Sequence, residues 1–499
     1  MHISFTDFYK TTNLKNYPFR DKTSEKENKK ELFINPPDYS SLEDAVASNH
    51  TTIISGNRGS GKTIILSDIQ TKYTTSKIIC FIDNYESIPL QSNKLQFYSL
   101  ILQNLTKHLL IYFVHNRKAL RNISKENKLF LSFLIHKYSD KITDEQLYSQ
   151  IENIQLNLFQ RIVNKISRPL TCVVNYGSTA VTNFGNEFLT THFGTYLPTI
   201  TEGSIKKIFP DIYFTVSNDF SSAEISYSLL DKSLKIITEI TNSIPLVVFD
   251  RLDEDTRLEN DSEIISEFIK ELICDTNLLL NENIQLLISV WSIPFSYLNA
   301  LFRRSKHYVF DIDWNFHQLE AVLNRRIQVY SENYITDYHT LFADDVDAND
   351  IKQIFNLSNS NPRDLWSIFD KIYHAQYEID KNSKILCKQA INLGLKNFVQ
   401  TFEFYEYYPR KKDARRNTND VYSYTKHLLK LKDTVEFTQE ELRQAAITGG
   451  STHNYITGME RIGLIDKTDQ KRAGGAVIYK VKDPKIIFAI YNSIDIDHN

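Results

Sequence analysis

Short apolar runs alternate with longer stretches of helical periodicity through the first 312 residues of this chain. Compact apolar runs occur at 51–54, 77–83, 244–250, 284–290 and 307–312, and runs of this kind are typical of buried parallel strands. Helical spacing follows at 64–73, from 95 to about 166, at 223–240 and at 260–280. This alternation predicts an α/β fold with a parallel sheet. Residues 171–220 show no clean period and are left unassigned.

The remaining residues follow a different pattern. Helical spacing continues from 314 to about 398, with a helix start at Asn361-Pro362. A helix is then expected at 420–431, and Thr438 with Glu441 forms a capping box that opens another, ending at 446. Ser451 is expected to cap a further helix to about 462. A strand beginning at 463–465, a polar basic tip at 466–475 and a strand at 476–481 complete a winged-helix layout.

One glycine-rich stretch indicates a chemical function in addition to a fold. Residues 56–63 complete the phosphate-loop pattern G-x-x-x-x-G-K-[ST] between a strand-like run and a helix-like run. Its backbone N–H groups can curl around a phosphate only where Cβ atoms do not interfere, and the following helix N-terminus adds positive potential. ATP is the expected ligand, with Mg²⁺. The residues assigned to nucleotide binding here are Gly56, Asn57, Arg58, Gly59, Ser60, Gly61, Lys62 and Thr63.

Within that loop, Lys62 is expected to contact the β- and γ-phosphates and Thr63 to ligate Mg²⁺. Asp250 ends the apolar run at 244–250, at the carboxyl end of a predicted strand, where ligands bind in open α/β sheets. We therefore expect Asp250 to hold the metal through water. Hydrolysis also needs a carboxylate that polarises water, and Asp253 and Glu254 are the candidates. Acids that favour a helix N-terminus are the alternative for this pair.

Other polar residues carry weaker predictions. Ser289 or Ser292 could contact the γ-phosphate from the end of the 284–290 run, or could be buried serines bonded to backbone. Arg363, in the first turn of its predicted helix, could reach the γ-phosphate from a lid, or form a surface pair with Asp364. Arg303 and Arg304, on a predicted helix, are either solvated or an arginine finger toward a neighbouring subunit.

Charge and cysteine usage narrow the classes of partner. The formal net charge is -3, so no chain-wide basic field indicates nucleic-acid or membrane binding. The four cysteines are widely spaced and predict neither a disulfide framework nor a zinc site. With no run of 18 apolar residues, we expect a cytoplasmic protein without a membrane span.

A local basic run remains a candidate for DNA binding. From Arg410 to Arg416 the chain has five bases and one acid. In the winged-helix region, Thr452, His453, Asn454 and Tyr455 could face a DNA groove, with Lys467, Lys471 and Arg472 in the wing. Acids slightly outnumber bases from 431 to 499, however, so contact with a protein is an equal alternative.

These patterns divide the chain into five parts. Residues 1–50 form a lead-in, and 51–312 form a P-loop ATPase core with an insertion at about 90–240. Residues 313–400 form a helical lid, 401–430 a basic linker and helix, and 431–499 the winged-helix domain.

The order of these motifs resembles AAA+ ATPases of the origin-recognition initiator branch and the related STAND signalling ATPases. The lead-in Asn16-Tyr17-Pro18-Phe19 and the loop at 56–63 resemble bacterial origin-recognition-like ATPases in particular. The resemblance covers most of the chain but not about 90–240. It implies that Lys62 and Thr63 bind phosphate and Mg²⁺, that Asp250 holds the metal, and that Arg363 takes the second-sensor position.

One residue departs from the initiator pattern. That pattern has Glu directly after the metal-binding Asp, and this chain has Arg251. Hydrolysis is therefore assigned to Asp253 or Glu254, and turnover is expected to be slow. The resemblance implies an ATP-dependent switch in an anti-phage defence or mobile-element system, acting on DNA or an effector protein, and a homo-oligomer. A replication initiator or helicase loader, and a scaffold that holds ATP without turnover, are the alternatives.

Overall fold

The computed structural model describes residues 3–20, 29–116, 223–410, 420–472 and 474–496, with scattered positions between 119 and 138. The stretch at 171–220 and most of the basic run after Arg410 lie outside these residues. Within them, no helix combines the length and the apolar character needed to cross a bilayer.

A five-stranded parallel sheet forms the centre of the molecule and confirms the predicted α/β class. Its order is β2-β3-β4-β1-β5. The strands are β1 (Thr52–Gly56), β2 (Ile79–Ile82), β3 (Leu246–Phe249), β4 (Gln285–Trp291) and β5 (Tyr308–Asp311). Because β4 separates β1 from β3, the phosphate loop after β1 and Asp250 after β3 lie on either side of the end of β4.

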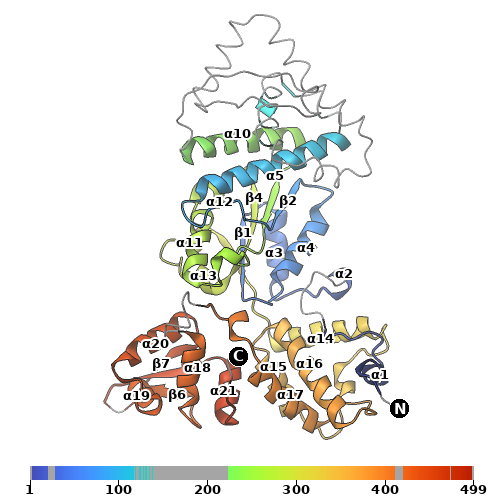
Figure 1. Cartoon of the computed structure of the whole chain (residues 1–499). Coiled ribbons are helices and arrows are strands. Elements are labelled where there is room, and N and C mark those ends of the chain that lie inside the picture. Colours follow the sequence, from blue (N-terminus) through green and yellow to red (C-terminus); the bar gives the residue numbers. More distant parts are fainter. Residues whose placement is uncertain are drawn as a thin grey trace, which may run out of the picture.

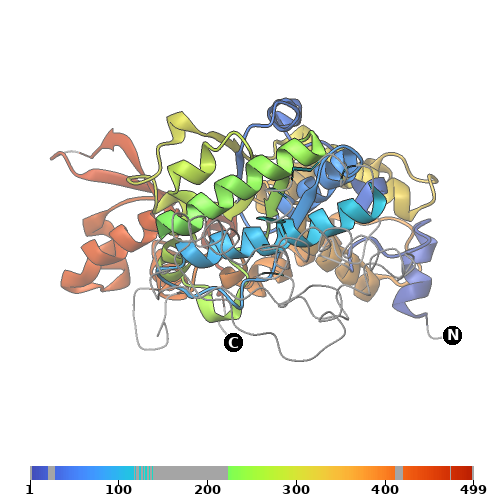
Figure 2. The ribbon, with the colours of Figure 1, turned by 90° about the horizontal axis from the view of Figure 1, so that it is seen from above.

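Alternate residues of the strands enter two hydrophobic cores, one on each face of the sheet. Ile53 and Val247 pack with α5 (Lys94–His115), α10 (Ala223–Thr241) and α11 (Ser262–Ile273). Ile54 and Val248 pack with α3 (Tyr39–Ala47) and α4 (Lys62–Tyr73). Figures 1 and 2 show α5 and α10 side by side across one side of the sheet.

The helical segment after β5 forms a separate layer below the sheet in Figure 1. Its main helices are α14 (Phe316–Tyr330), α15 (Ala348–Leu357), α16 (Pro362–Ile379) and α17 (Lys388–Gln400). A Cβ built on Gly394 would lie 2.7 Å from Ile372 Cα, so the glycine permits the close approach of α17 to α16. The lead-in, including α1 (Phe5–Thr11), packs on this layer: Phe19 stacks on Phe369, and Tyr17 donates to Asp370 at 2.9 Å.

The last described segment pairs helices with a three-stranded antiparallel sheet of order β6-β8-β7. Its strands are β6 (Glu436–Thr438), β7 (Ile465–Lys471) and β8 (Val477–Val481). Its helices are α18 (Val421–Leu429), α19 (Gln439–Ala446), α20 (Thr452–Arg461) and α21 (Pro484–Tyr491). The core of this segment is continuous with that of α14–α17. The remaining short elements are α2 (Lys29–Leu32), α12 (Thr276–Leu279) and α13 (Ser292–Ser296).

Several local predictions are confirmed. The capping box of Thr438 and Glu441 opens α19, and Pro362 stands in the first turn of α16 behind the cap Asn361. Both are short-range hydrogen-bond patterns, which the sequence specifies within four residues.

Other local predictions are wrong. Arg303 and Arg304 are not on an α-helix, because Arg303 only precedes a 3₁₀ turn at Arg304–Lys306. Ser451 precedes α20, but its side chain caps no amide. The stretch 466–475 is not all tip, since β7 continues to Lys471.

The predicted groove-facing stretch of α20 is also wrong in part. Thr452 and Tyr455 are buried, and only His453 and Asn454 are exposed. Lys467, Lys471 and Arg472 are exposed as expected.

Candidate nucleotide site

The phosphate loop joins the end of β1 to the start of α4. Gly59 and Gly61 have φ of +81° and +96°, a backbone region that residues with side chains rarely adopt. A Cβ on Gly59 would lie 2.7 Å from both Arg363 Cβ and Asn361 Oδ1. The glycine at 59 is therefore required twice, for the turn and for the close approach of α16.

Lys62 begins α4 and bends back over its own loop. Its Nζ donates to Gly56 O at 2.9 Å and to Asn57 O at 3.0 Å. Burial lowers the pKa of Lys62, and the carboxylates of Asp253 and Asp250 act in the opposite direction. The ammonium group is thus held in the loop on the side of the two acids, where it can exchange a carbonyl for a phosphate oxygen.

Asp250 is 1% exposed and comes directly after β3. Its Oδ1 accepts a hydrogen bond of 2.7 Å from Ser289 Oγ, whereas its buried Oδ2 has no hydrogen-bond partner. Ser289 is brought there by the sheet, because its neighbour Ile288 pairs with Phe249 of β3. Tyr85 fixes the same strand end by donating to Asp250 O at 2.7 Å.

The free oxygen of Asp250 fits a role toward Mg²⁺. A buried carboxylate oxygen without a donor is costly unless a cation or water satisfies it. Within the described ranges, no group of three or more His, Cys, Asp or Glu side chains gathers as a metal site. Mg²⁺ here would therefore depend on Asp250, Thr63, water and phosphate oxygens, which is the mixed ligand set this ion prefers with nucleotides.

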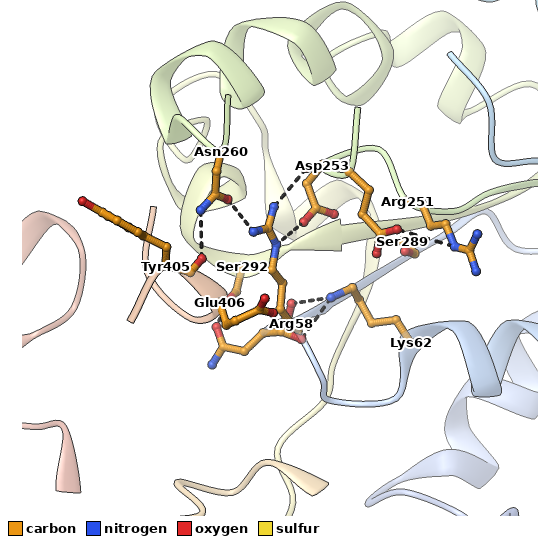
Figure 3. A network of polar contacts seen from close by, with 12 residues as sticks. Arg58, Lys62, Arg251, Asp253, Asn260, Ser289, Ser292, Tyr405 and Glu406 are labelled. Carbon is orange, nitrogen blue, oxygen red and sulfur yellow. Dashed lines mark hydrogen bonds and ion pairs between the residues drawn. The ribbon is translucent and has the colours of Figure 1, made fainter. Parts of the chain in front are cut away.

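Asp253 is already engaged by the phosphate loop. Arg58 Nε donates to Asp253 Oδ2 at 2.7 Å, and Arg58 Nη2 donates to Asp253 O at 2.9 Å. The same guanidinium contacts Asn260 Oδ1 and lies 4.2 Å from the centroid of the Trp291 ring. Figure 3 shows Arg58 reaching from the loop to Asp253 and Asn260. The side chain of Arg58 therefore ties two loops of the protein together, and a nucleotide contact of Arg58 through the loop backbone stays a prediction.

Glu254 is the more available of the two predicted water-polarising acids. Its side chain is 59% exposed, and its Oε2 lies 3.7 Å from Arg251 Nε. Desolvation, and then the nearby Asp253 carboxylate, raise the pKa of Glu254. Arg251 has a φ of +58°, so the residue directly after Asp250 turns the chain. The Glu254 carboxylate is thus paired with the arginine that follows Asp250 in sequence.

The two candidate serines have different partners. Ser289 bonds to Asp250, as described above, and Ser292 Oγ donates to Asn57 Oδ1 at 2.6 Å. Neither serine hydroxyl is bonded to a backbone atom, so the alternative of a buried serine bonded to backbone is wrong for both. Ser289 therefore orients the Asp250 carboxylate, and Ser292 orients the second residue of the phosphate loop.

The first turn of α16 lies on the phosphate loop. Asn361 Nδ2 donates to Arg58 O at 2.7 Å, and Asn361 Oδ1 accepts the Arg363 amide at 3.0 Å. Arg363 forms an ion pair of 3.2 Å with Glu406, not the surface pair with Asp364. Its Nε is buried without a hydrogen-bond partner. Arg363 thus lies beside the phosphate loop, and its contact with the γ-phosphate stays a prediction.

Sequence reasoning missed three residues that complete this site. Trp314 Nε1 donates to Ser60 O at 2.8 Å. Asn260 Oδ1 accepts a hydrogen bond from Arg58 Nη1, and Tyr407 Oη accepts one from Asn57 Nδ2 at 2.7 Å. All three lie about 200 residues or more from their partners in the phosphate loop. No local motif surrounds them, and only long-range packing reveals them.

Comparison with known proteins gives matches among solved structures, but none among family models or curated proteins. Among solved structures, Cdc6p from Pyrobaculum aerophilum is similar at 12% identity and a TM-score of 0.29, over 97% of this chain and 98% of that one.

The ORC2 protein of Aeropyrum pernix is similar in two structures, each at 10% identity over 94% of this chain and 98% of that one. The TM-scores are 0.37 for its ADPNP-ADP complexes and 0.33 for its ADP form. Because these scores are below 0.5, the likenesses carry no argument about function. The fold class rests on the sheet order and the phosphate loop of this chain.

Replacing Asp253 by Ala should destabilise the part of the protein built on the parallel sheet, because it leaves the Arg58 guanidinium without its buried carboxylate. Hydrogen bonds to charged groups contribute about 1.5 to 3 kcal/mol. We expect the free energy of unfolding to fall by about this amount. Denaturant unfolding monitored by tryptophan fluorescence measures it. Glu254→Ala is the matched control and should cost less than about 0.5 kcal/mol. Equal losses in the two variants would contradict the assignment.

Proposed function

We propose that this chain binds ATP with Mg²⁺ and acts as a nucleotide-dependent switch of the AAA+ or STAND type. The observation that carries the proposal is the convergence of a complete phosphate loop, an orphaned buried carboxylate oxygen on Asp250 and the first turn of α16 on one end of the sheet. Phosphate loops, a metal-site acid and a cation from a second layer are the parts that phosphoryl-transfer sites require.

The residues of the site each have a defined role in this proposal. The N–H groups at 56–63 surround the phosphates, Lys62 neutralises charge on them, and Thr63 and Asp250 hold Mg²⁺, with Ser289 orienting Asp250. The metal, when bound, neutralises the negative charge that develops on the phosphates. Arg363 contacts the terminal phosphate from α16. Glu254 is the acid that polarises water, because Asp253 is held by Arg58.

Slow turnover follows from the same contacts. A water-polarising carboxylate must be held within hydrogen-bond reach of the attacking water. Glu254 is exposed and paired with Arg251, and Asp253 is tied to Arg58. Neither is pre-positioned as strongly as Asp250. A protein that retains ATP for long periods suits a switch better than a motor.

The biological setting is proposed on weaker grounds. By its resemblance to bacterial origin-recognition-like ATPases, the chain is proposed to be the ATPase of an anti-phage defence or mobile-element system, in the cytoplasm. Its partners would be a separate effector protein or DNA, bound by the proposed winged helix of 431–499, and further copies of the chain. A replication initiator or helicase loader fits the same site equally well, as does a scaffold that holds ATP.

Replacing Lys62 by Ala should weaken ATP binding by about 10- to 100-fold, because it removes a charged donor to the phosphates. Binding of a fluorescent ATP analogue measures this directly. Lys72→Ala is the matched control, since Lys72 lies on the same helix and pairs with Glu43 and Asp68 at the surface. Unchanged affinity in Lys62→Ala would overturn the proposed site.

The DNA alternatives can be separated from protein contact by salt dependence. Neutralising Lys411, Lys412, Arg415 and Arg416 with Gln should reduce the slope of log affinity against log salt by up to about 3 to 4 units if these bases contact phosphates. Arg410 is left intact because its guanidinium lies 5.4 Å from the centroid of the Tyr405 ring.

A matched variant controls for net charge in that experiment. It replaces four exposed lysines elsewhere by Gln: Lys10, Lys352, Lys384 and Lys396. The expected slope of this variant is that of the wild type. Equal slopes in all three proteins would favour protein contact over DNA binding by the basic run.

A further inference from the structure

The chain segment 403–410 lies against the nucleotide site although it follows the last lid helix. Asn260 Nδ2 donates to Tyr405 O at 2.8 Å, and the Arg410 amide donates to Asn260 O at 2.9 Å. The hydroxyl of Tyr407 accepts from Asn57 Nδ2 at 2.7 Å and from Asn359 Nδ2 at 3.0 Å. Tyr407 is 8% exposed. This segment therefore contacts the phosphate loop, the proposed lid and the loop at 250–261 after β3, which is called the acidic loop below.

Within this segment, Glu406 holds the arginine that faces the phosphate loop. Its carboxylate pairs with Arg363 Nη1 at 3.2 Å. The side chain of Glu406 is 63% exposed and that of Arg363 is 31% exposed. An ion pair of this exposure is weak and easily exchanged. The Nε of Arg363 makes no hydrogen bond, so the fork of the guanidinium is only partly used.

Asp364, the residue after Arg363 in α16, contacts a buried cluster of charged side chains formed with Lys485 and Asp483. Lys485 of α21 is fully buried, and its Nζ lies 3.1 Å from Asp364 Oδ2 and 3.9 Å from Asp483 Oδ2. Tyr408 donates to Asp483 at 2.8 Å, and the Lys485 ammonium lies 5.2 Å from the centroid of the Tyr407 ring. Charges this deeply buried are stable only while each keeps its partners.

These contacts form a continuous connection between the nucleotide site and the C-terminal segment. Arg363 and Asp364 are adjacent in one helical turn, the first toward the phosphate loop and the second toward α21. Tyr407 and Tyr408 are adjacent in 403–410 in the same way. A displacement of this segment must therefore act on both the phosphate loop and the Lys485 cluster, because the same residues contact both.

We propose that residues 403–410 are a nucleotide-responsive latch, in which Glu406 and the terminal phosphate of ATP compete for Arg363. The inference rests on the proposed ATP binding and names the regulation of that site. A terminal phosphate carries more negative charge than a carboxylate and offers several acceptors to the planar guanidinium, so it displaces Glu406. ADP lacks that phosphate and leaves the Arg363–Glu406 pair intact. The change in position of 403–410 between the ATP-bound and ADP-bound states is then transmitted to the C-terminal segment through Tyr408 and Lys485.

The first test compares ATP and ADP affinities in Glu406→Gln. Removing the competing charge should tighten binding of a non-hydrolysable ATP analogue by about 1.5- to 5-fold, the range expected for an exposed ion pair, and leave ADP affinity unchanged. Glu440→Gln is the matched control, because Glu440 forms an exposed pair with Arg443 on α19. Its affinities for both nucleotides should equal those of the wild type.

The second test uses hydrogen exchange in the wild-type chain, which does not depend on a variant folding. Peptides covering 403–410 and α21 should exchange faster with the ATP analogue than with ADP, because only the former releases Glu406. Tyr407→Phe should raise exchange of 403–410 with both nucleotides, since the ring is kept and the hydrogen bonds from Asn57 and Asn359 are lost. Tyr334→Phe, at an exposed position, should change nothing.

The outcomes separate the latch from the site it rests on. A wild-type chain that binds neither nucleotide refutes the proposed function and the latch together. If it binds both, but Glu406→Gln shifts both affinities equally or neither, and exchange at 403–410 is the same with each nucleotide, the latch alone is refuted.

Discussion

The geometry of the nucleotide site depends on Arg58, whose side chain and backbone are both engaged. Its guanidinium reaches Asp253, Asn260 and the face of Trp291, and its carbonyl oxygen accepts from Asn361. The phosphate loop is therefore fixed to the acidic loop after β3 on one side and to the first turn of α16 on the other. Gly59 permits this closeness, because a Cβ there would overlap Arg363 and Asn361.

These contacts support the proposal that the site holds ATP and turns it over slowly. At this site, the Asp250 carboxylate keeps a buried oxygen without a hydrogen-bond partner, which suits a metal. The two acids that could polarise water are each paired with an arginine, Asp253 with Arg58 and Glu254 with Arg251. Arg251 directly follows Asp250, turns the chain through a positive φ and pairs with Glu254.

Much of the local structure could be predicted from the sequence. Compact apolar runs specified the five strands of the parallel sheet, and Asn361 and Thr438 specified two helix starts, because these signals act over a few residues. The wrong predictions arose where a local pattern was ambiguous, as at Arg303, or where tertiary packing decided exposure, as at Thr452 and Tyr455.

The site itself was predictable only in part. The phosphate loop, Asp250 and Arg363 have motifs or a characteristic order along the chain. The partners of Arg58, the contact of Tyr407 with Asn57 and the pairing of Lys485 with Asp364 join residues 121 to 350 positions apart. Pairing at such separations depends on the topology of the whole chain, which no residue window contains.

We propose that this site holds Mg·ATP and turns it over slowly. Single-turnover hydrolysis of ATP by the wild-type chain with Mg²⁺ tests this, after binding has been verified on the same sample. We expect saturable binding and a hydrolysis rate well below about 1 s⁻¹, the lower end of common enzyme turnover. A rate near the typical value of about 10 s⁻¹ would contradict it, because the paired state of Asp253 and Glu254 would then not limit the chemistry.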